Sequence, residues 1–383
     1  MIGTTSPRPG VIPLYGTLAM ALAWSALSST PAWSQGSVNA AGHGRSWAAP
    51  RTPDGKPDLQ GNWSNETQTP LERMSKQGLA LSTEQAAALE TRAQLVEEFR
   101  DRPSDPNAPP PSKGGDGSLS PPGEKTFVEQ IAEAAGGAVG GYNGFWLDPG
   151  NKVIRIDGVA RSSIIVDPPD GRIPALTAEA KQRVAERMAH IKKFGEFDHP
   201  EVRSLSDRCI TSFGSNAGPP MLPNYFYNNN YSIVQTPDHV MIMTEMVHDV
   251  RIIRLGATHH TAAQVAPWFG DSIGRWQGDT LVVETTNINP TQLAVTSPLW
   301  AYRGASDKLK VTERFTRTSA DVLLYEFTVE DPSTFTAPFS GELPFNRSDE
   351  PIYEYACHEG NYALPGILAG ARQQEKQQAE KQQ

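Results

Sequence analysis

The amino-acid sequence predicts a mainly β protein, in the form of an antiparallel barrel or half-barrel with a few peripheral helices. Such a fold needs many turns, and the 383 residues include 33 Gly and 32 Pro. Beyond Tyr225 apolar and polar residues alternate with the period of two that a strand with one buried face requires. The sequence lacks the regular alternation of strands and helices that predicts a parallel sheet. The alternating runs are residues 231–236, 239–247, 250–255, 275–286, 308–317, 321–330 and 352–357.

The N-terminal residues predict export. Residues 16–31 form an apolar stretch that follows Arg8, and Ala32 and Ser34 supply the small residues of a signal-peptidase site. The apolar run is shorter than the ~20 residues of a membrane-spanning helix, which favours cleavage over an anchor. We therefore expect a periplasmic or secreted protein. Its expected parts are a signal peptide over 1–34, a Pro-rich extension with one or two helices and a linker over 35–140, an antiparallel β domain over 141–370 and a polar tail over 371–383.

Two helices are predicted by the residues at their N-termini. Ser82 and Gln85 have the spacing of a capping box, and Thr177 is a favourable N-cap for a second helix. The pair Asp157-Gly158 predicts a turn between two short strands. We expect both helices to cover the outside of the barrel.

Charge and the lack of known motifs restrict the function classes. A net charge of -9, with no Lys/Arg cluster to offset it, disfavours binding to nucleic acid and to an anionic membrane surface. The sequence has no phosphate loop, dinucleotide fingerprint or G-x-S-x-G elbow, so no cofactor is expected. His358-Glu359 lacks the second histidine that a zinc-binding helix presents four residues on, so no metal is expected either. The alternative is a metal site formed by His358 and Glu359 with the pair His259-His260. The expected partner is a small-molecule ligand or substrate.

Cys209 and Cys357 are the two cysteines of the chain. In an exported protein an even number of cysteines predicts a disulfide. A bond across this separation stabilises the fold by about 4–5 kcal/mol if it is unstrained. The alternative is a thiolate that acts as a ligand or nucleophile beside His358.

Three runs of the sequence carry a family resemblance. They are "WFGDSIGRWQGDTLVVETTNI", "TERFTRTSADVLLYEFTVEDPSTFT" and "IYEYACHEGNY". Together they resemble a large family of uncharacterised exported bacterial proteins, through the motif W-x-G-x-S-x-G-x-W-x-G-D-T-L-V-V. The similarity spans roughly residues 61–370 and implies no established activity. Where such proteins often continue into D-G-R-x-H, this chain has "RLGATHHT", which leaves the role of His259 or His260 open.

A shorter motif resembles the strand signature of lipocalin or calycin barrels. It is G-x-W, at Gly61 and Trp63 and again at Gly274 and Trp276. The resemblance implies a barrel whose interior encloses one small ligand. We expect residues 61–63 to add an edge strand to the β domain that begins near residue 141.

The stretch "HVMIMTEMVHDVRII" holds the first candidate site. If it is a strand, its methionines divide between the two faces, which argues against a copper site built from converging thioethers. A bend at Val247-His248 would bring Glu245 or Asp249 to the imidazole, as acid–base catalysis requires. Glu245, His248 and Asp249 are therefore the candidate catalytic residues. The alternative is a hydrogen-bonded histidine at the barrel rim.

The candidate substrate-binding residues come from three other places. Tyr225 and Tyr227, in "PNYFYNNNYS", offer ring faces beside amides, or form an Asn-rich turn. Arg161, Arg208 and Arg275 could each bind a carboxylate, or pair with an acidic residue of the chain. Arg251 is a further candidate for substrate binding and belongs to the stretch of the first candidate site. The end of the run 352–357 adds His358, which a disulfide would bring towards the segment around Cys209.

Two functions remain open from the sequence. The first is an exported enzyme that uses histidine and carboxylate acid–base chemistry on a small aromatic, terpenoid or glycosidic compound, as a lyase, isomerase or hydrolase. The second is a non-catalytic periplasmic protein that binds a small hydrophobic ligand. An enzyme is expected to show turnover governed by a group that titrates near neutral pH, whereas a binding protein consumes nothing.

Overall fold

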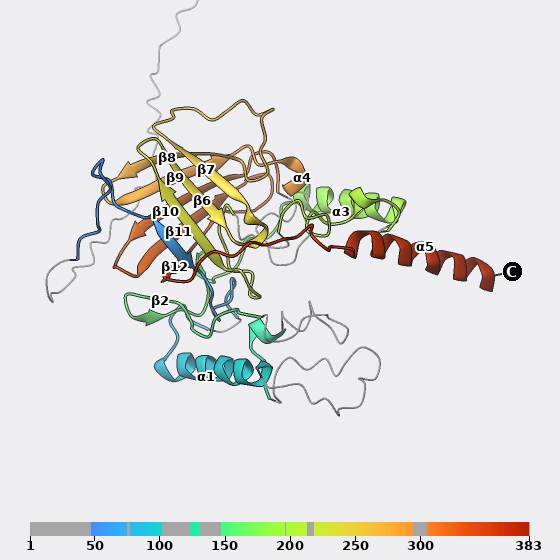
Figure 1. Ribbon diagram of the computed structural model, residues 1–383, viewed down its shortest axis with the longest axis horizontal. Coiled ribbons are helices and arrows are strands. Elements are labelled where there is room, and N and C mark those ends of the chain that lie inside the picture. Colours follow the sequence, from blue (N-terminus) through green and yellow to red (C-terminus); the bar gives the residue numbers. More distant parts are fainter. Residues whose placement is uncertain are drawn as a thin grey trace, which may run out of the picture. The chain divides into compact units, whose positions relative to one another are not determined.

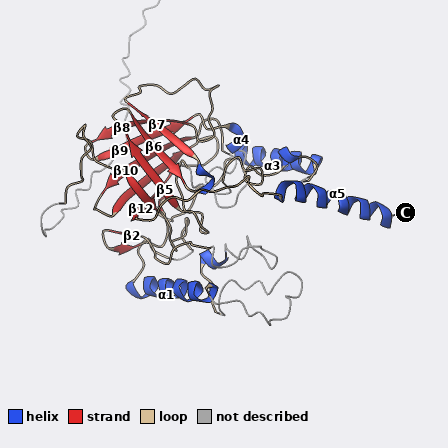
Figure 2. Cartoon of the chain, in the orientation of Figure 1, coloured by secondary structure: helices blue, strands red, loops and turns tan. Residues whose placement is uncertain are grey.

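The computed structural model describes residues 47–74, 77–101, 123–130, 147–195, 197–212, 218–293 and 305–382. The predicted signal peptide therefore lies outside the described residues. Figures 1 and 2 show a β-barrel with helices beside it. The helices are α1 (Thr83–Arg100), α3 (Ala178–Phe194), α4 (Pro290–Leu293) and α5 (Ala363–Lys381), with short 3-10 turns η2 (Pro200–Val202) and η3 (Met246–His248). Among the described residues no helix is both long and apolar enough to cross a membrane.

Nine strands close into a barrel in the order β1-β5-β6-β7-β8-β9-β10-β11-β12, and β12 pairs back with β1. A further strand, β4 (Ile165–Asp167), pairs with the first half of β12, and β2 (Arg155–Ile156) and β3 (Val159–Ala160) form a separate hairpin. The barrel strands are β1 (Gly61–Ser64), β5 (Asn230–Gln235), β6 (His239–Thr244), β7 (Val250–Leu255), β8 (Asp271–Gln277), β9 (Thr280–Thr286), β10 (Lys310–Arg317), β11 (Val322–Glu330) and β12 (Phe339–Ser348).

The barrel is mixed, so the prediction of an entirely antiparallel barrel is wrong at one pair. β7 and β8 run parallel, with Ile253 opposite Ser272. A parallel pair needs a crossover connection, and here the loop 256–270 supplies it without a helix. The parallel pair could not be recognised from the sequence, because its usual indication is a helix between the two strands.

Two other strand predictions are wrong: the edge position of residues 61–63 and the strand over residues 352–357. β1 is not an edge strand, because it pairs with both β5 and β12 and so closes the barrel. The last strand is β12, whereas the run 352–357 forms no strand. β12 escaped prediction because Gly341 and Pro344, two residues disfavoured in strands, interrupt its alternation.

The helix caps agree with the sequence. Ser82 accepts a hydrogen bond from the amide of Gln85, whose side chain accepts one from the Ser82 amide, so the capping box at α1 is confirmed. Thr177 caps α3 through the amide of Ala180. These bonds satisfy amides that the first helical turn leaves unpaired.

The barrel interior is packed with side chains. Every second residue of β10 and β11 is buried, as alternation predicts, and β12 follows the same pattern from Phe339 to Leu343. The ring of Tyr325 lies 5.0 Å from that of Phe315 and 5.1 Å from that of Phe345, and Tyr231 stacks on Phe345 at 5.1 Å. These rings fill the centre, so along the described strands the expected ligand cavity inside the barrel is not found. A barrel of about eight strands is just wide enough for side chains to fill it.

Gly341 shows how tightly β12 packs. A methyl group at this position would overlap the ring of Phe327 and approach the backbone oxygen of Ile164. We expect Gly341→Ala to lower the free energy of unfolding by about 1–3 kcal/mol. Gly366→Ala in α5 is the control, because no atom lies near its added methyl, and it should leave stability unchanged or raise it. Denaturant unfolding measures both, and equal stabilities of the two variants would contradict the prediction.

Candidate functional site

The stretch "HVMIMT" forms β6 and shows the predicted alternation. Ile242 and Thr244 are buried, whereas Met241 and Met243 point out of the barrel. The chain then bends, because Val247 adopts a left-handed backbone conformation with φ of 59°. The bend breaks the alternation, so Glu245 and Met246 are both buried.

Glu245 lies at this bend and is held by two neighbouring segments. Its Oε2 accepts a hydrogen bond from Asn230 Nδ2 at 2.8 Å, and its Oε1 accepts one from the amide of Tyr353 at 3.0 Å. The carboxylate thus joins β5 to the C-terminal segment. The backbone of His248 belongs to η3, but its side chain lies outside what the structure describes.

Asp249 follows the bend and is partly buried. No residue of the described chain forms a hydrogen bond with its Oδ2. Burial raises the pKa of Asp249 to about 7. A buried carboxyl without a partner favours its neutral form, and such groups are enriched at functional sites.

A second acidic group lines a pocket at the same end of the barrel. The pocket has a volume of about 200 Å³ and lies between α1, the segment 123–130, the loop 147–151 and the residues that follow β1. Among the residues that line it are Glu66, Gln68, Glu97, Arg100 and Asp148. We call this cavity the Glu66 pocket.

Glu66 is the most strongly perturbed acid of the pocket. Burial, followed by the charges of Asp148 and Glu97, raises its pKa to about 7. Burial also raises the pKa of Asp148, against a backbone hydrogen bond from Gly150 and with the charges of Glu97 and Glu245. Glu97 is held by Asn151 Nδ2 at 3.1 Å. Like charges in a partly buried pocket favour protonation of one carboxyl.

The Glu66 pocket and the β6–β7 bend are neighbours. The negative charge of Glu245 is one of the causes that raise the pKa of Asp148. Two consecutive asparagines, Asn229 and Asn230, contact one acid each. Asn229 Nδ2 donates to the backbone oxygen of Asp148 at 3.4 Å, and Asn230 donates to Glu245. The predicted catalytic stretch and the Asn-rich run therefore meet at one end of the barrel, beside a pocket that the sequence did not indicate.

The two raised carboxyls make stability depend on pH. The pKa of Glu66 rises from 4.5 to about 7 and that of Asp249 from 3.8 to about 7, so the folded state holds both protons more tightly. Their stabilising contribution is complete below about pH 4 and is lost as the pH rises through 7. We expect Glu66→Gln and Asp249→Asn each to flatten the decline in unfolding free energy between pH 4.5 and 7. An unchanged slope in both variants would contradict this.

Arg251 lies in the core instead of facing a ligand. Its Nη1 lies 2.9 Å from Glu313 Oε2 and its Nη2 donates to Glu313 Oε1 at 3.0 Å. Tyr325 donates its hydroxyl proton to the same Oε1 at 2.8 Å and accepts from the amide of Met221 at 2.9 Å. Met221 belongs to the segment that packs into this end of the barrel core. The sequence did not single out Glu313 or Tyr325.

The other predicted binding residues are placed as follows. Tyr225 is buried, its hydroxyl donates to the backbone oxygen of Thr69 at 3.1 Å, and burial raises its pKa. Tyr227 is partly buried beside the ring of Phe226. Arg161 pairs with Glu342 at 3.0 Å.

Two further predicted residues lie at the surface. Arg275 is exposed on β8, and His358 is exposed just after Cys357. Tyr225 lies near the Glu66 pocket: its ring meets Phe127 edge-on at 5.3 Å, next to the lining residues Thr126 and Val128.

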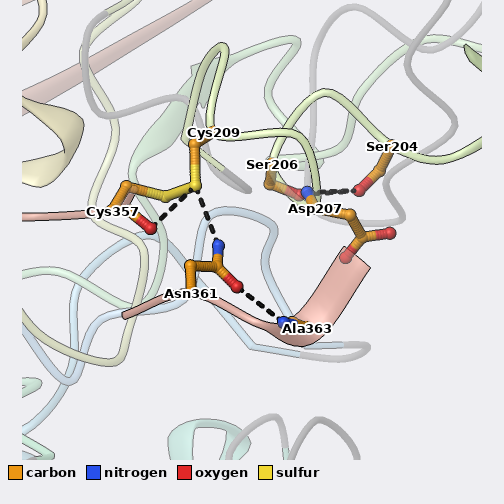
Figure 3. The surroundings of a disulfide bond; sticks show 7 residues. All are labelled: Ser204, Ser206, Asp207, Cys209, Cys357, Asn361 and Ala363. Carbon is orange, nitrogen blue, oxygen red and sulfur yellow. Dashed lines mark hydrogen bonds between the residues drawn. A yellow bond between two sulfur atoms is a disulfide. The ribbon is translucent and has the colours of Figure 1, made fainter. Parts of the chain in front are cut away.

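The predicted disulfide is present. Cys209 and Cys357 are joined with their Cα atoms 5.7 Å apart, and Asn361 Nδ2 donates to Cys209 Sγ at 3.0 Å (Figure 3). The bond fixes the C-terminal segment to the loop around residue 209, close to where Tyr353 binds Glu245. Disulfides persist in oxidising compartments, which is consistent with export.

The two histidines of "RLGATHHT" have different surroundings. His259 is exposed, whereas His260 Nδ1 lies 2.9 Å from Asp271 Oδ2 and its Nε2 lies 3.4 Å from Glu284 Oε1. Arg254 binds the same Asp271 at 2.8 Å. These contacts hold the crossover loop 256–270 against the outer face of β7, β8 and β9. In the described part of the chain no group of three or more His, Cys, Asp or Glu residues could hold a metal ion.

No protein-family model matches the chain, and no curated protein matches it. Membership in the exported bacterial family remains a prediction, and so does the likeness to lipocalins beyond the barrel itself. The function must therefore be argued from the residues.

Proposed function

We propose that the protein is an acid–base enzyme that acts on a small hydroxylated compound in the Glu66 pocket, as a lyase, isomerase or hydrolase. The observation that carries the proposal is the position of Glu66. It lines a cavity of about 200 Å³, and its pKa is raised to about 7. A carboxyl group with a pKa near the working pH takes up and releases a proton readily, which is what acid–base catalysis needs.

The pocket's size and lining favour one class of substrate. A cavity of roughly 150 Å³ is known to hold a benzene molecule, so this pocket has room for a compound of about one ring. Glu66, Glu97 and Asp148 accept hydrogen bonds and repel anions. A neutral compound that carries hydroxyl groups, such as a glycoside or a phenol, fits this lining better than a terpenoid hydrocarbon.

Each acid has a separate role in the proposed reaction. Glu66 transfers the proton, and burial together with the charge of Asp148 keeps its pKa near neutrality. Asp148 also stabilises positive charge that develops on the substrate. The bend that holds Glu245, His248 and Asp249 lies beside the pocket and supplies a further carboxyl of raised pKa, Asp249. These three remain the catalytic candidates predicted from sequence.

The test compares two nearly isosteric variants. The purified protein is incubated with a panel of small glycosides and hydroxylated aromatic compounds, and conversion is followed by mass spectrometry. We expect Glu66→Gln to lower kcat/KM by at least about a hundredfold, because acid–base residues contribute that much or more. The fold of Glu66→Gln is checked by its melting temperature.

Asp249→Asn is the matched variant outside the pocket. A smaller loss in Asp249→Asn than in Glu66→Gln supports chemistry in the pocket. If only Asp249→Asn loses activity, the reaction belongs to the β6–β7 bend and the assignment to Glu66 is wrong. Binding without conversion of any compound would leave the protein a binding protein and refute the enzymatic proposal.

A further inference from the structure

One loop that lines the Glu66 pocket, from Asp148 to Asn151, contacts all three acids of the pocket. Asp148 is itself one of these acids. Asn151 Nδ2 donates a hydrogen bond to Glu97 Oε2 at 3.1 Å. Between these two residues, Gly150 lies against the side chain of Glu66. Four consecutive residues therefore bring the acids of the pocket together.

The position of Gly150 has no room for a side chain. Its backbone φ of 75° lies in the left-handed region, which residues with a Cβ atom rarely adopt. A methyl group on Gly150 would lie 2.8 Å from Cγ, 3.0 Å from Cβ and 3.2 Å from Cδ of Glu66. Carbon atoms pack best at about 3.5–4.0 Å. With a methyl group at this position, either the Glu66 side chain or the loop would have to move.

The backbone of Gly150 holds two further residues of the pocket. Its amide donates a hydrogen bond to the carboxylate of Asp148. Its oxygen accepts one from Gln68 Nε2 at 2.6 Å, and the amide of Gln68 donates to the oxygen of Lys152 at 2.8 Å. The segment that carries Glu66 is thus joined to the loop directly beside the acid.

The backbone of Glu66 is fixed by the barrel. β1 ends at Ser64, whose Oγ accepts a hydrogen bond from the Glu66 amide at 3.3 Å. The amide of Asn65 donates to the oxygen of Asn229 at 3.1 Å. Since the barrel holds the backbone, the contact with the loop determines where the Glu66 side chain lies.

We propose that Gly150 is a positioning residue for the reaction in the Glu66 pocket. Because it has no side chain, the loop lies directly against Glu66, shields this carboxyl from bulk water and keeps it beside Asp148. The inference rests on the proposed function, since it concerns the same acid. It adds a residue that does not itself react.

Gly150→Ala tests the proposal, and Gly158→Ala is its matched control. Gly158 has nearly the same φ, 77°, but no described atom outside its own neighbours lies within 4 Å of a methyl group added there. Both substitutions therefore strain the backbone alike, and we expect them to lower the melting temperature by similar amounts. Only Gly150→Ala also displaces the side chain of Glu66.

Titration of the Glu66 carboxyl gives a readout that needs no substrate. It is followed by carbon-13 NMR of protein with labelled glutamate, and its signal is the one that Glu66→Gln lacks. Burial raises the pKa of Glu66 to about 7 in the original protein. In Gly150→Ala either the side chain moves into the cavity or the loop moves away from it, so water reaches the carboxyl and its pKa falls. In Gly158→Ala the carboxyl should titrate as in the original protein.

Activity gives the second readout. We expect Gly150→Ala to lower kcat at least about tenfold, because a misplacement of about 1 Å can cost about a hundredfold, and Gly158→Ala to leave kcat unchanged. An unchanged titration of Glu66 in Gly150→Ala, or an equal change in Gly158→Ala, would overturn the proposal. A changed titration in a protein that converts no compound would support the placement of Glu66 by Gly150 and would refute the enzymatic proposal alone.

Gln68→Met is a second variant, for the case in which Gly150→Ala does not fold. It removes the hydrogen bond to the oxygen of Gly150 without straining the backbone, and the flexible methionine side chain adapts to the space of the glutamine. We expect the pKa of Glu66 to fall in this variant too, because the loop is no longer joined to the segment beside the acid. If Glu66 titrates in Gln68→Met as in the original protein, the loop does not position it.

Discussion

Glu313→Gln is expected to lower the free energy of unfolding by about 3–5 kcal/mol. The side chains of Glu313 and Arg251 are 0% and 3% exposed, and they form two contacts of 2.9 and 3.0 Å. Tyr325 adds a hydrogen bond of 2.8 Å to the same carboxylate. Glutamine keeps the size of the side chain but leaves the guanidinium of Arg251 without its countercharge in the core. Equilibrium unfolding in denaturant gives the difference.

The control for Glu313→Gln is the same substitution at a neighbouring, exposed pair. Glu326 lies 3.8 Å from Arg314, and both side chains are about 40% exposed. Exposed pairs contribute about 0–1 kcal/mol, so Glu326→Gln should change stability little. If the two variants agree within 1 kcal/mol, the buried pair is not held as the structure indicates.

A double variant shows whether the loss of stability comes from the charge that is left unpaired. Replacing Arg251 by Met and Glu313 by Leu removes both charges together. Such replacements of buried pairs are often neutral or stabilising, because desolvation of the two ions opposes their attraction. We expect the double variant to recover most of the stability that Glu313→Gln loses.

Local patterns of the sequence predicted much of the fold. Alternation identified most of the barrel strands, and the caps at Ser82 and Thr177 identified two helices. The parallel pair of β7 and β8 could not be predicted, because it depends on a long-range contact across the loop 256–270 that has no local pattern. β12 was hidden by Gly341 and Pro344. Gly341 packs against the ring of Phe327, and Pro344 lies between the residues of β12 that pair with β4 and those that pair with β1.

The candidate site was predictable in part. The bend after Thr244 and the acids at Glu245 and Asp249 were visible in one short stretch, since they are close in sequence. Glu66 and Asp148 gave no signal, because their raised pKa values arise from burial between segments far apart in the chain and then from the charges of acids distant in sequence, such as Glu97. The filled interior could not be predicted from the sequence either. Alternation predicts which side chains point into the barrel, but not whether they pack against one another or enclose a cavity.

Reduction of the Cys209–Cys357 bond is expected to lower the free energy of unfolding by about 5 kcal/mol. The two cysteines are 148 residues apart, and cross-linking so long a loop removes much of the conformational entropy of the unfolded chain. Denaturant unfolding with and without reductant measures the effect. The Cys209→Ser/Cys357→Ser double variant is the control, and reductant should not change its stability. Equal unfolding curves of the reduced and oxidised protein would contradict the prediction.

The bond also has a local consequence at the candidate site. The C-terminal segment leaves β12, places the amide of Tyr353 on Glu245 at 3.0 Å and then reaches the disulfide at Cys357. Without the bond, non-covalent contacts such as the hydrogen bond of Asn361 with Cys209 and the exposed ion pair of Arg372 with Asp198 hold its far end. We therefore expect the Tyr353 amide to exchange its hydrogen faster in the reduced protein, while amides of β10 and β11 lose protection only in step with global stability. Equal acceleration at all these amides would mean that the disulfide stabilises the whole fold without holding this segment against Glu245.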